Sequence, residues 1–131
     1  MSFGFGVGDF IALAGLAARV YTAYKHAPDD YSHISEELEV LQILIDKAAK
    51  HFKGTNISSD DRHYGQTVLK ECHSVLENLH SFKPYKSLAS TKSLIFTGIK
   101  IGKDLQESLI TNTALLKGFV RRSVVRTITL H

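Results

Sequence analysis

Apolar residues recur every three or four positions along four segments of the chain, and this is the period of a helix that buries one face. The four stripes consist of Phe10, Leu13, Ala17, Val20 and Tyr24; Ile34, Leu38, Leu41, Ile45, Ala48 and Phe52; Val68, Cys72, Val75, Leu79 and Phe82; and Ile101, Leu105, Leu109, Asn112, Leu116 and Phe119. Short connections between them favour antiparallel neighbours. The pattern therefore predicts an all-α four-helix bundle that uses residues 1–131 as one domain.

Residues that start and stop helices support this division of the chain. Asp and Ser side chains can accept a hydrogen bond from a free N–H at a helix start, whereas Gly and Pro favour its end. Expected starts are at Asp9, Ser35 (followed by Glu36 and Glu37) and Ser58 or Ser59, and expected ends lie near Ala27 (before Pro28), Gly54 and Pro84.

The segment from residue 86 to residue 102 is ambiguous. Residues 94–99 have strand propensity, but no second segment offers a partner strand. We therefore expect a break, or a short extra helix around residues 90–100, with Gly98 and Gly102 marking the break.

Composition fits one ordinary globular domain. The chain has 131 residues, of which 44% are hydrophobic and 22% are charged. Its one cysteine, Cys72, excludes an intrachain disulfide and points to a reducing, cytoplasmic setting.

Charge is distributed unevenly along the chain. Residues 1–82 carry seven Lys or Arg and eleven Asp or Glu, while residues 83–131 carry nine and two. Acidic and basic helices could pair within the bundle, or the basic part could face anionic lipid. The second interpretation rests on a basic surface of Lys117, Arg121, Arg122 and Arg126. Nucleic acid is not an expected partner, because aromatics among these residues are few and no helix-turn-helix signature occurs.

Candidate chemistry in the sequence is weak. The glycines of residues 4–8 lack the strand and the Gly-Lys-Ser/Thr of a phosphate loop. His73, Glu77 and His80 share a helix face, as zinc ligands could, but they lie beside the core stripe and suit a solvated surface. No catalytic set of side chains has local support. We expect no enzyme activity, no metal and no cofactor.

The first helix is the most informative segment, since no polar side chain occurs between Phe10 and Ala18. A central bundle helix would explain this, and so would insertion into a membrane after release from the bundle. Residues 9–26 would make a helix of ~27 Å, slightly shorter than the ~30 Å hydrocarbon core. The candidate membrane- or oligomer-active residues are Phe3, Phe5, Asp9, Phe10, Ile11, Leu13 and Leu16.

The opening sequence, from Met1 to Ala12 (MSFGFGVGDFIA), resembles the start of the N-terminal HeLo-like domain of fungal STAND (NLR-like) proteins. Further matching stretches are Ala27-Pro28 followed by Ile34-Ser35; Cys72, Val75, Leu76 and Leu79 leading into Tyr85-Lys86-Ser87-Leu88; and Asn112-Thr113 with Leu115, Leu116 and Phe119. The chain departs from the family in having no tryptophan before the fourth helix, where Phe96 and Ile99 stand.

The resemblance implies a helical bundle at the head of a larger receptor, ahead of a nucleotide-binding module. It implies signalling in programmed cell death or heterokaryon incompatibility, by oligomerisation and by membrane engagement through the first helix. Expected partners are further copies of the chain, anionic lipid and the receptor's own nucleotide-binding module, with a cytoplasmic protein joining the membrane on activation. The alternative is a protein–protein interaction module without membrane activity.

Overall fold

The computed structural model describes residues 6–26, 31–53, 58–82 and 92–130, without the side chains of Val7, Ser32, 92–99 and 125–130. The described chain forms four helices, α1 (Val7–Tyr24), α2 (Ser32–Phe52), α3 (Ser59–Ser81) and α4 (Lys92–Leu130), and these ranges contain no strand. The predicted all-α four-helix architecture is confirmed.

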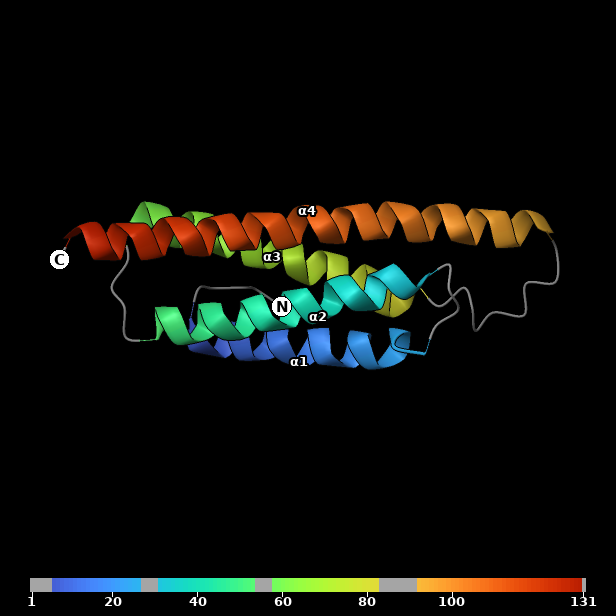
Figure 1. The fold of residues 1–131 in the computed structure, drawn as a ribbon, viewed down its shortest axis with the longest axis horizontal. Coiled ribbons are helices and arrows are strands. Elements are labelled where there is room, and N and C mark those ends of the chain that lie inside the picture. The colour runs from blue at the N-terminus through green and yellow to red at the C-terminus, as the bar shows by residue number, and fades with distance from the viewer. Residues whose placement is uncertain (1–5, 27–30, 54–57, 83–91, 131) are drawn as a thin grey trace.

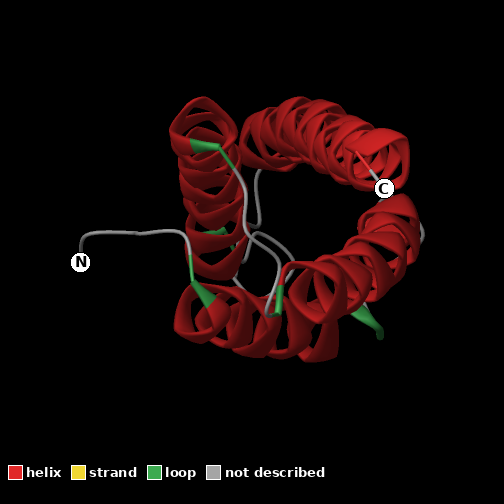
Figure 2. Ribbon diagram, turned by 90° about the vertical axis from the view of Figure 1, so that its left-hand side faces the viewer, coloured by secondary structure: helices red, strands yellow, loops and turns green. Residues whose placement is uncertain are grey.

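The helices run along the long axis of the molecule (Figure 1) and, seen end-on, surround a common centre (Figure 2). Both α1 and α4 pack against α2 and α3, so α1 and α4 lie diagonally opposite each other. Each helix therefore turns one side to the core and the opposite side to solvent.

The predicted stripes supply most of the core. Fully buried apolar side chains come from all four helices, among them Leu13, Leu38, Leu41, Ile45, Leu79, Leu109 and Leu116. The stripes omitted Leu16, Leu69 and Leu76, which are also buried because α1 and α3 each contact two neighbours. Ile101 was wrongly included, since it is 42% exposed while its neighbour Gly102 is buried.

Two helix starts differ from the sequence prediction. The N-cap of α1 is Gly6, and Asp9 lies three residues later, where its carboxylate accepts a hydrogen bond of 2.9 Å from the Gly6 N–H. The second helix begins at Ser32 instead of Ser35, with Tyr31 as N-cap. The expected start of α3 is confirmed, because the Ser58 hydroxyl accepts the Asp61 N–H at 3.2 Å.

The ends of the first three helices fall slightly before the predicted stop signals. Helix α1 ends at Tyr24 instead of near Ala27, while α2 and α3 end at Phe52 and Ser81. Pro28, Gly54 and Pro84 themselves lie outside the described residues.

Helix α4 is continuous over 39 residues, so the expected break or short extra helix around residues 90–100 is wrong. Gly102 instead serves packing. A Cβ there would lie 2.8 Å from Cε1 of Tyr31, whose ring packs edge-on against Phe82 at 6.2 Å. Glycine costs helix stability in isolation, but here it lets a buried ring reach the helix backbone.

Candidate interaction surfaces

The inward face of α1 is part of the core. Of the side chains that the sequence suggested for membrane or oligomer contact, Phe10, Leu13 and Leu16 are 1%, 0% and 6% exposed. Phe3 and Phe5 lie outside the described residues. Only an opened form of the bundle could offer Phe10, Leu13 and Leu16 to a lipid or a partner.

A chain of rings holds the N-terminal half of α1 to the other three helices. Phe10 of α1 stacks on Phe52 of α2 with ring centroids 5.9 Å apart, and Phe52 stacks on Phe119 of α4 at 5.3 Å. Phe119 in turn contacts Tyr64 of α3 at 5.6 Å. Opening α1 therefore disturbs a contact that all four helices share.

The C-terminal end of α1 is held by a hydroxyl group. Tyr24 donates a hydrogen bond shared between the carbonyl oxygens of Leu79, at 2.9 Å, and Phe82, at 2.6 Å. Carbonyls in the last turn of a helix lack partners within that helix, so the Tyr24 hydroxyl supplies one to the end of α3. The sequence predicted the burial of Tyr24 but not this bond, although a buried tyrosine usually has a partner for its hydroxyl.

The outward face of α1 carries no charge between Asp9 and Arg19. Ile11 is 65% exposed, and Ala12, Gly15 and Ala18 are exposed beside it. The outward faces of the other helices carry many charged groups, for example Glu36, Lys47, Arg62, Lys70, Lys103 and Glu107. Between Phe10 and Ala18, α1 is therefore uncharged on its solvent side as well as on its core side.

A shallow, open pocket of about 260 Å³ lies between α1 and α2, lined by Tyr21, Glu39, Gln42 and Ile43. The Tyr21 hydroxyl donates a 2.7 Å hydrogen bond to Glu39, and this bond raises the pKa of the tyrosine. The hydrogen bond links α1 to α2 at the wall of this pocket.

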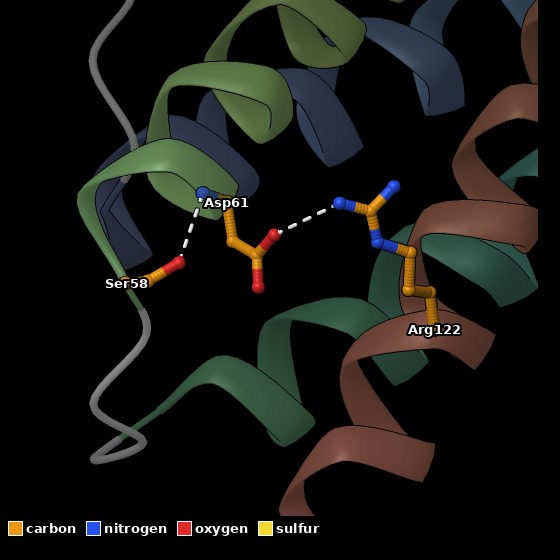
Figure 3. A network of polar contacts seen from close by, with 3 residues as sticks. All are labelled: Ser58, Asp61 and Arg122. Atoms are coloured by element: carbon orange, nitrogen blue, oxygen red, sulfur yellow. Dashed lines mark hydrogen bonds and ion pairs between the residues drawn. The ribbon is translucent and has the colours of Figure 1, made fainter.

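The structure describes three of the four side chains of the predicted basic surface, and one of them, Arg122, makes a contact within the bundle. Lys117 and Arg121 are exposed on α4, whereas Arg122 turns toward α3 and its Nη2 lies 3.3 Å from Oδ1 of Asp61 (Figure 3). The Arg122 guanidinium also lies 5.7 Å from the centre of the Tyr64 ring. Arg122 thus supports pairing of charges within the bundle. The helix includes Arg126, but its side chain is outside the described part.

The Arg122–Asp61 contact should make a measurable contribution to stability. Asp61 is largely buried and Arg122 is about half exposed, so we expect Arg122→Gln to lower the free energy of unfolding by about 1 kcal/mol. Arg121→Gln is the matched control, expected to change it by less than about 0.5 kcal/mol. Urea unfolding followed by circular dichroism measures both, and equal effects of the two substitutions would contradict a specific role for Arg122.

His73, Glu77 and His80 of α3 differ in exposure: Glu77 is exposed, whereas His73 and His80 are half-buried, so the expected solvated surface is only partly correct. Nδ1 of His80 is buried and has no hydrogen-bond partner in the described part of the chain. His73 Nε2 lies 3.3 Å from Glu77 Oε1, an ordinary pair one helical turn apart. Among the described residues, no group of three or more His, Cys, Asp or Glu side chains could hold a metal ion. Cys72 is buried, and burial raises the pKa of its thiol to about 12, so it is a poor nucleophile.

None of the described helices is long and apolar enough to cross a membrane. Comparison of the chain with protein-family models, with curated proteins and with solved structures finds no match. The most unusual feature of the described residues is α1, which has no charge on its outward face between Asp9 and Arg19.

Proposed function

We propose that this chain is a signalling domain at the head of a receptor, of the HeLo-like type that its sequence resembles. It acts in programmed cell death or heterokaryon incompatibility, by self-association and by engagement of the membrane through α1. The observation that carries the proposal is the uncharged, exposed face of α1 around Ile11.

A surface helix of a globular domain ordinarily turns polar residues to water. Between Phe10 and Ala18, α1 has apolar residues on its core side and small or apolar residues on its solvent side, so this part of the helix suits an apolar environment on both. Its 18 residues span ~27 Å, slightly less than the ~30 Å of hydrocarbon. A single α1 would therefore lie in the interface, and several copies together could perturb the bilayer.

Membrane engagement by the whole of α1 requires its release. Release exposes Phe10, Leu13 and Leu16 and breaks the Phe10–Phe52 stack and the Tyr24 hydrogen bond. These contacts keep the helix packed until a trigger favours the open form, and burial in lipid or in an oligomer would offset their loss. Lys117 and Arg121, exposed on α4, could add about 1 kcal/mol each on an anionic membrane.

The second candidate is an interaction module that holds partner proteins without touching lipid. The burial of Phe10, Leu13 and Leu16 favours it, because the closed bundle presents only the outward face of α1. The two candidates differ in whether lipid is perturbed.

Ile11→Glu tests the proposed function without disturbing the core. Ile11 is 65% exposed, so the variant should fold normally, but a charge in the apolar face opposes contact with lipid. We expect the variant no longer to cause leakage from phosphatidylserine vesicles and no longer to be toxic when it is overexpressed in fungal cells. Ile43→Glu, at an isoleucine of α2 that is 56% exposed, is the matched control and should keep both activities.

Two outcomes decide against membrane engagement. If Ile11→Glu and Ile43→Glu behave alike, α1 is not the active surface. If the unmodified domain neither makes vesicles leak nor kills cells, the interaction module becomes the better account of the function. Deletion of residues 2–8 removes Phe3 and Phe5 together with the N-cap and the first two residues of α1, and the same assays measure its effect.

A further inference from the structure

The outward side of α2 carries two large apolar side chains. Val40 is 46% exposed and Ile43, about one turn later, is 56% exposed. Neither side chain belongs to the core of its own chain, and β-branched residues favour a helix slightly less than straight-chain residues do. Folding of the described part of the bundle therefore gives little reason for both residues at these positions, whereas a contact with another molecule would explain them.

Two opposite charges flank this apolar pair along the same side of α2. Four residues at spacings of four, three and four lie on one line along the helix: Glu36, Val40, Ile43 and Lys47. All four side chains are exposed. The line runs from an acid through two apolar residues to a base, and its spacing is the same from either end. A second copy in the opposite orientation therefore matches it at every position.

We propose that α2 pairs with α2 of a second copy of this chain, antiparallel, around a two-fold axis that passes between Val40 and Ile43. The axis sets each Val40 against the other copy's Ile43 and each Glu36 against the other copy's Lys47. The apolar contacts lie ~2 Å from the axis along the helix, and the charged contacts lie ~8 Å from it. The interface is isologous, with an apolar centre and a charged rim.

The charges beside this line are compatible with the pairing. His33 Nδ1 lies 3.5 Å from Glu36 Oε2, and Lys50 Nζ lies 3.1 Å from Asp46 Oδ2, so each of the two bases has an acid of its own helix beside it. The axis brings His33 level with the other copy's Lys50, and their neighbouring acids offset the repulsion between these two groups. Glu39 accepts a hydrogen bond from α1 and lies to one side of the line.

The charge pattern selects the antiparallel orientation. A parallel pair would set Glu36 against Glu36 and Lys47 against Lys47, so both ends of the line would repel. The antiparallel pair makes two attractive contacts instead, and it sets the opposite ends of the two helix dipoles beside each other.

The same line fits a second copy better than a lipid surface. Its one acid and one base sum to zero charge, so it has no net attraction to an anionic membrane. The pairing goes beyond the proposed function, because it joins closed bundles through α2 and leaves α1 in place.

Reversal of one charge tests the pairing. Glu36→Lys or Lys47→Glu turns both charged contacts into repulsions, and both side chains are exposed, so folding should persist. One helix per copy buries less than the ~1,000 Å² of a stable interface, so the dissociation constant should fall between about 1 µM and 1 mM. In sedimentation equilibrium we expect each single reversal to raise it at least about tenfold.

The double variant, with Glu36→Lys and Lys47→Glu in one chain, should pair again, because it restores both attractions with the signs exchanged. Its dissociation constant should return close to that of the unmodified chain. Glu71→Lys, at an exposed position of α3, is the matched single reversal and should leave the dissociation constant unchanged. A monomer at all concentrations up to ~1 mM overturns the proposal. So does a dimer that the single reversals leave intact, or one that a folded double variant fails to restore.

Cysteine cross-linking tests the orientation. Mixed chains carrying Glu36→Cys and Lys47→Cys should form a disulfide between position 36 of one copy and position 47 of the other, and the second Glu36–Lys47 contact stays intact in that pair. Two copies of the Glu36→Cys chain would hold their new thiols ~16 Å apart along the helices, too far for a disulfide. Cys72 is buried and gives little background. Preferential bonds between the two copies of position 36 would overturn the antiparallel arrangement.

The readouts separate this pairing from the proposed function. Ile43→Glu sets a carboxylate against the other copy's Val40, so it should also raise the dissociation constant, but it leaves α1 unchanged and should still make vesicles leak. A wild-type dimer of this geometry that never makes vesicles leak retains the pairing and removes the membrane step. An unmodified chain that stays monomeric and makes vesicles leak removes the pairing and retains the membrane step.

Discussion

Leu13→Glu is expected to abolish cooperative folding, whereas Ile11→Glu, two residues earlier in the same helix, should change stability by less than about 0.5 kcal/mol. Leu13 is fully buried, and Ile11 is 65% exposed. An ionised carboxylate in an apolar core without a partner costs at least several kcal/mol. Domains of this size are stable by only about 5–15 kcal/mol in total.

Circular dichroism and thermal unfolding of the two variants measure this difference. A cooperative transition for Leu13→Glu near that of the unmodified chain would contradict the packing of α1 against the core. The same reasoning applies to Leu16, which is 6% exposed. Loss of activity in a Leu13→Glu or Leu16→Glu variant would therefore report unfolding, and only the outward face of α1 offers clean functional tests.

The sequence predicted the helices because helical periodicity is a local property of the chain. Phe10, Leu13, Ala17, Val20 and Tyr24 repeat at spacings of three and four, and all five are buried. The start of α3 was also predictable, since Ser58 bonds to an N–H only three residues away. Interactions between residues within one or two helical turns of each other can therefore be predicted from the sequence.

Features that depend on tertiary contacts were not predictable in the same way. From the sequence, Gly102 suggests a helix break. In the fold it packs against the ring of Tyr31, which lies 71 positions earlier in the sequence. The sequence suggests that Asp61 is an acid at a helix start and that Arg122 is part of a basic surface. The fold brings the two side chains together. Nothing in the sequence around either residue identifies the other.

The candidate site was partly predictable for the same reason. The absence of charge from Phe10 to Ala18 is visible in the sequence and singled out α1. The sequence placed Phe10 and Leu13 on the buried stripe, but it did not assign Leu16 to the buried side or Ile11 to the exposed side. The division depends on the contacts of α1 with α2 and α3.

Phe119→Ala is expected to lower the free energy of unfolding by about 3–5 kcal/mol. The Phe119 side chain is 3% exposed, and its ring lies between Phe52 and Tyr64 with centroid distances of 5.3 Å and 5.6 Å. Truncation removes apolar burial and leaves a cavity, and it also interrupts the chain of rings that reaches Phe10 on α1. The effect should therefore extend through Phe52 to α1.

Ile110→Ala is the matched control on α4, since Ile110 is 43% exposed and its truncation should cost less than about 0.5 kcal/mol. Urea unfolding gives both free energies, and amide hydrogen exchange reports the opening of single helices. We expect the amides in the first half of α1 to exchange faster in Phe119→Ala than those of α3, because Phe10 loses the support of Phe52. Equal acceleration in every helix would show that Phe119 stabilises the bundle as a whole without holding α1 in particular. If the stacked rings keep α1 packed in the bundle, then Phe119→Ala should also make vesicles leak at a lower protein concentration than Ile110→Ala.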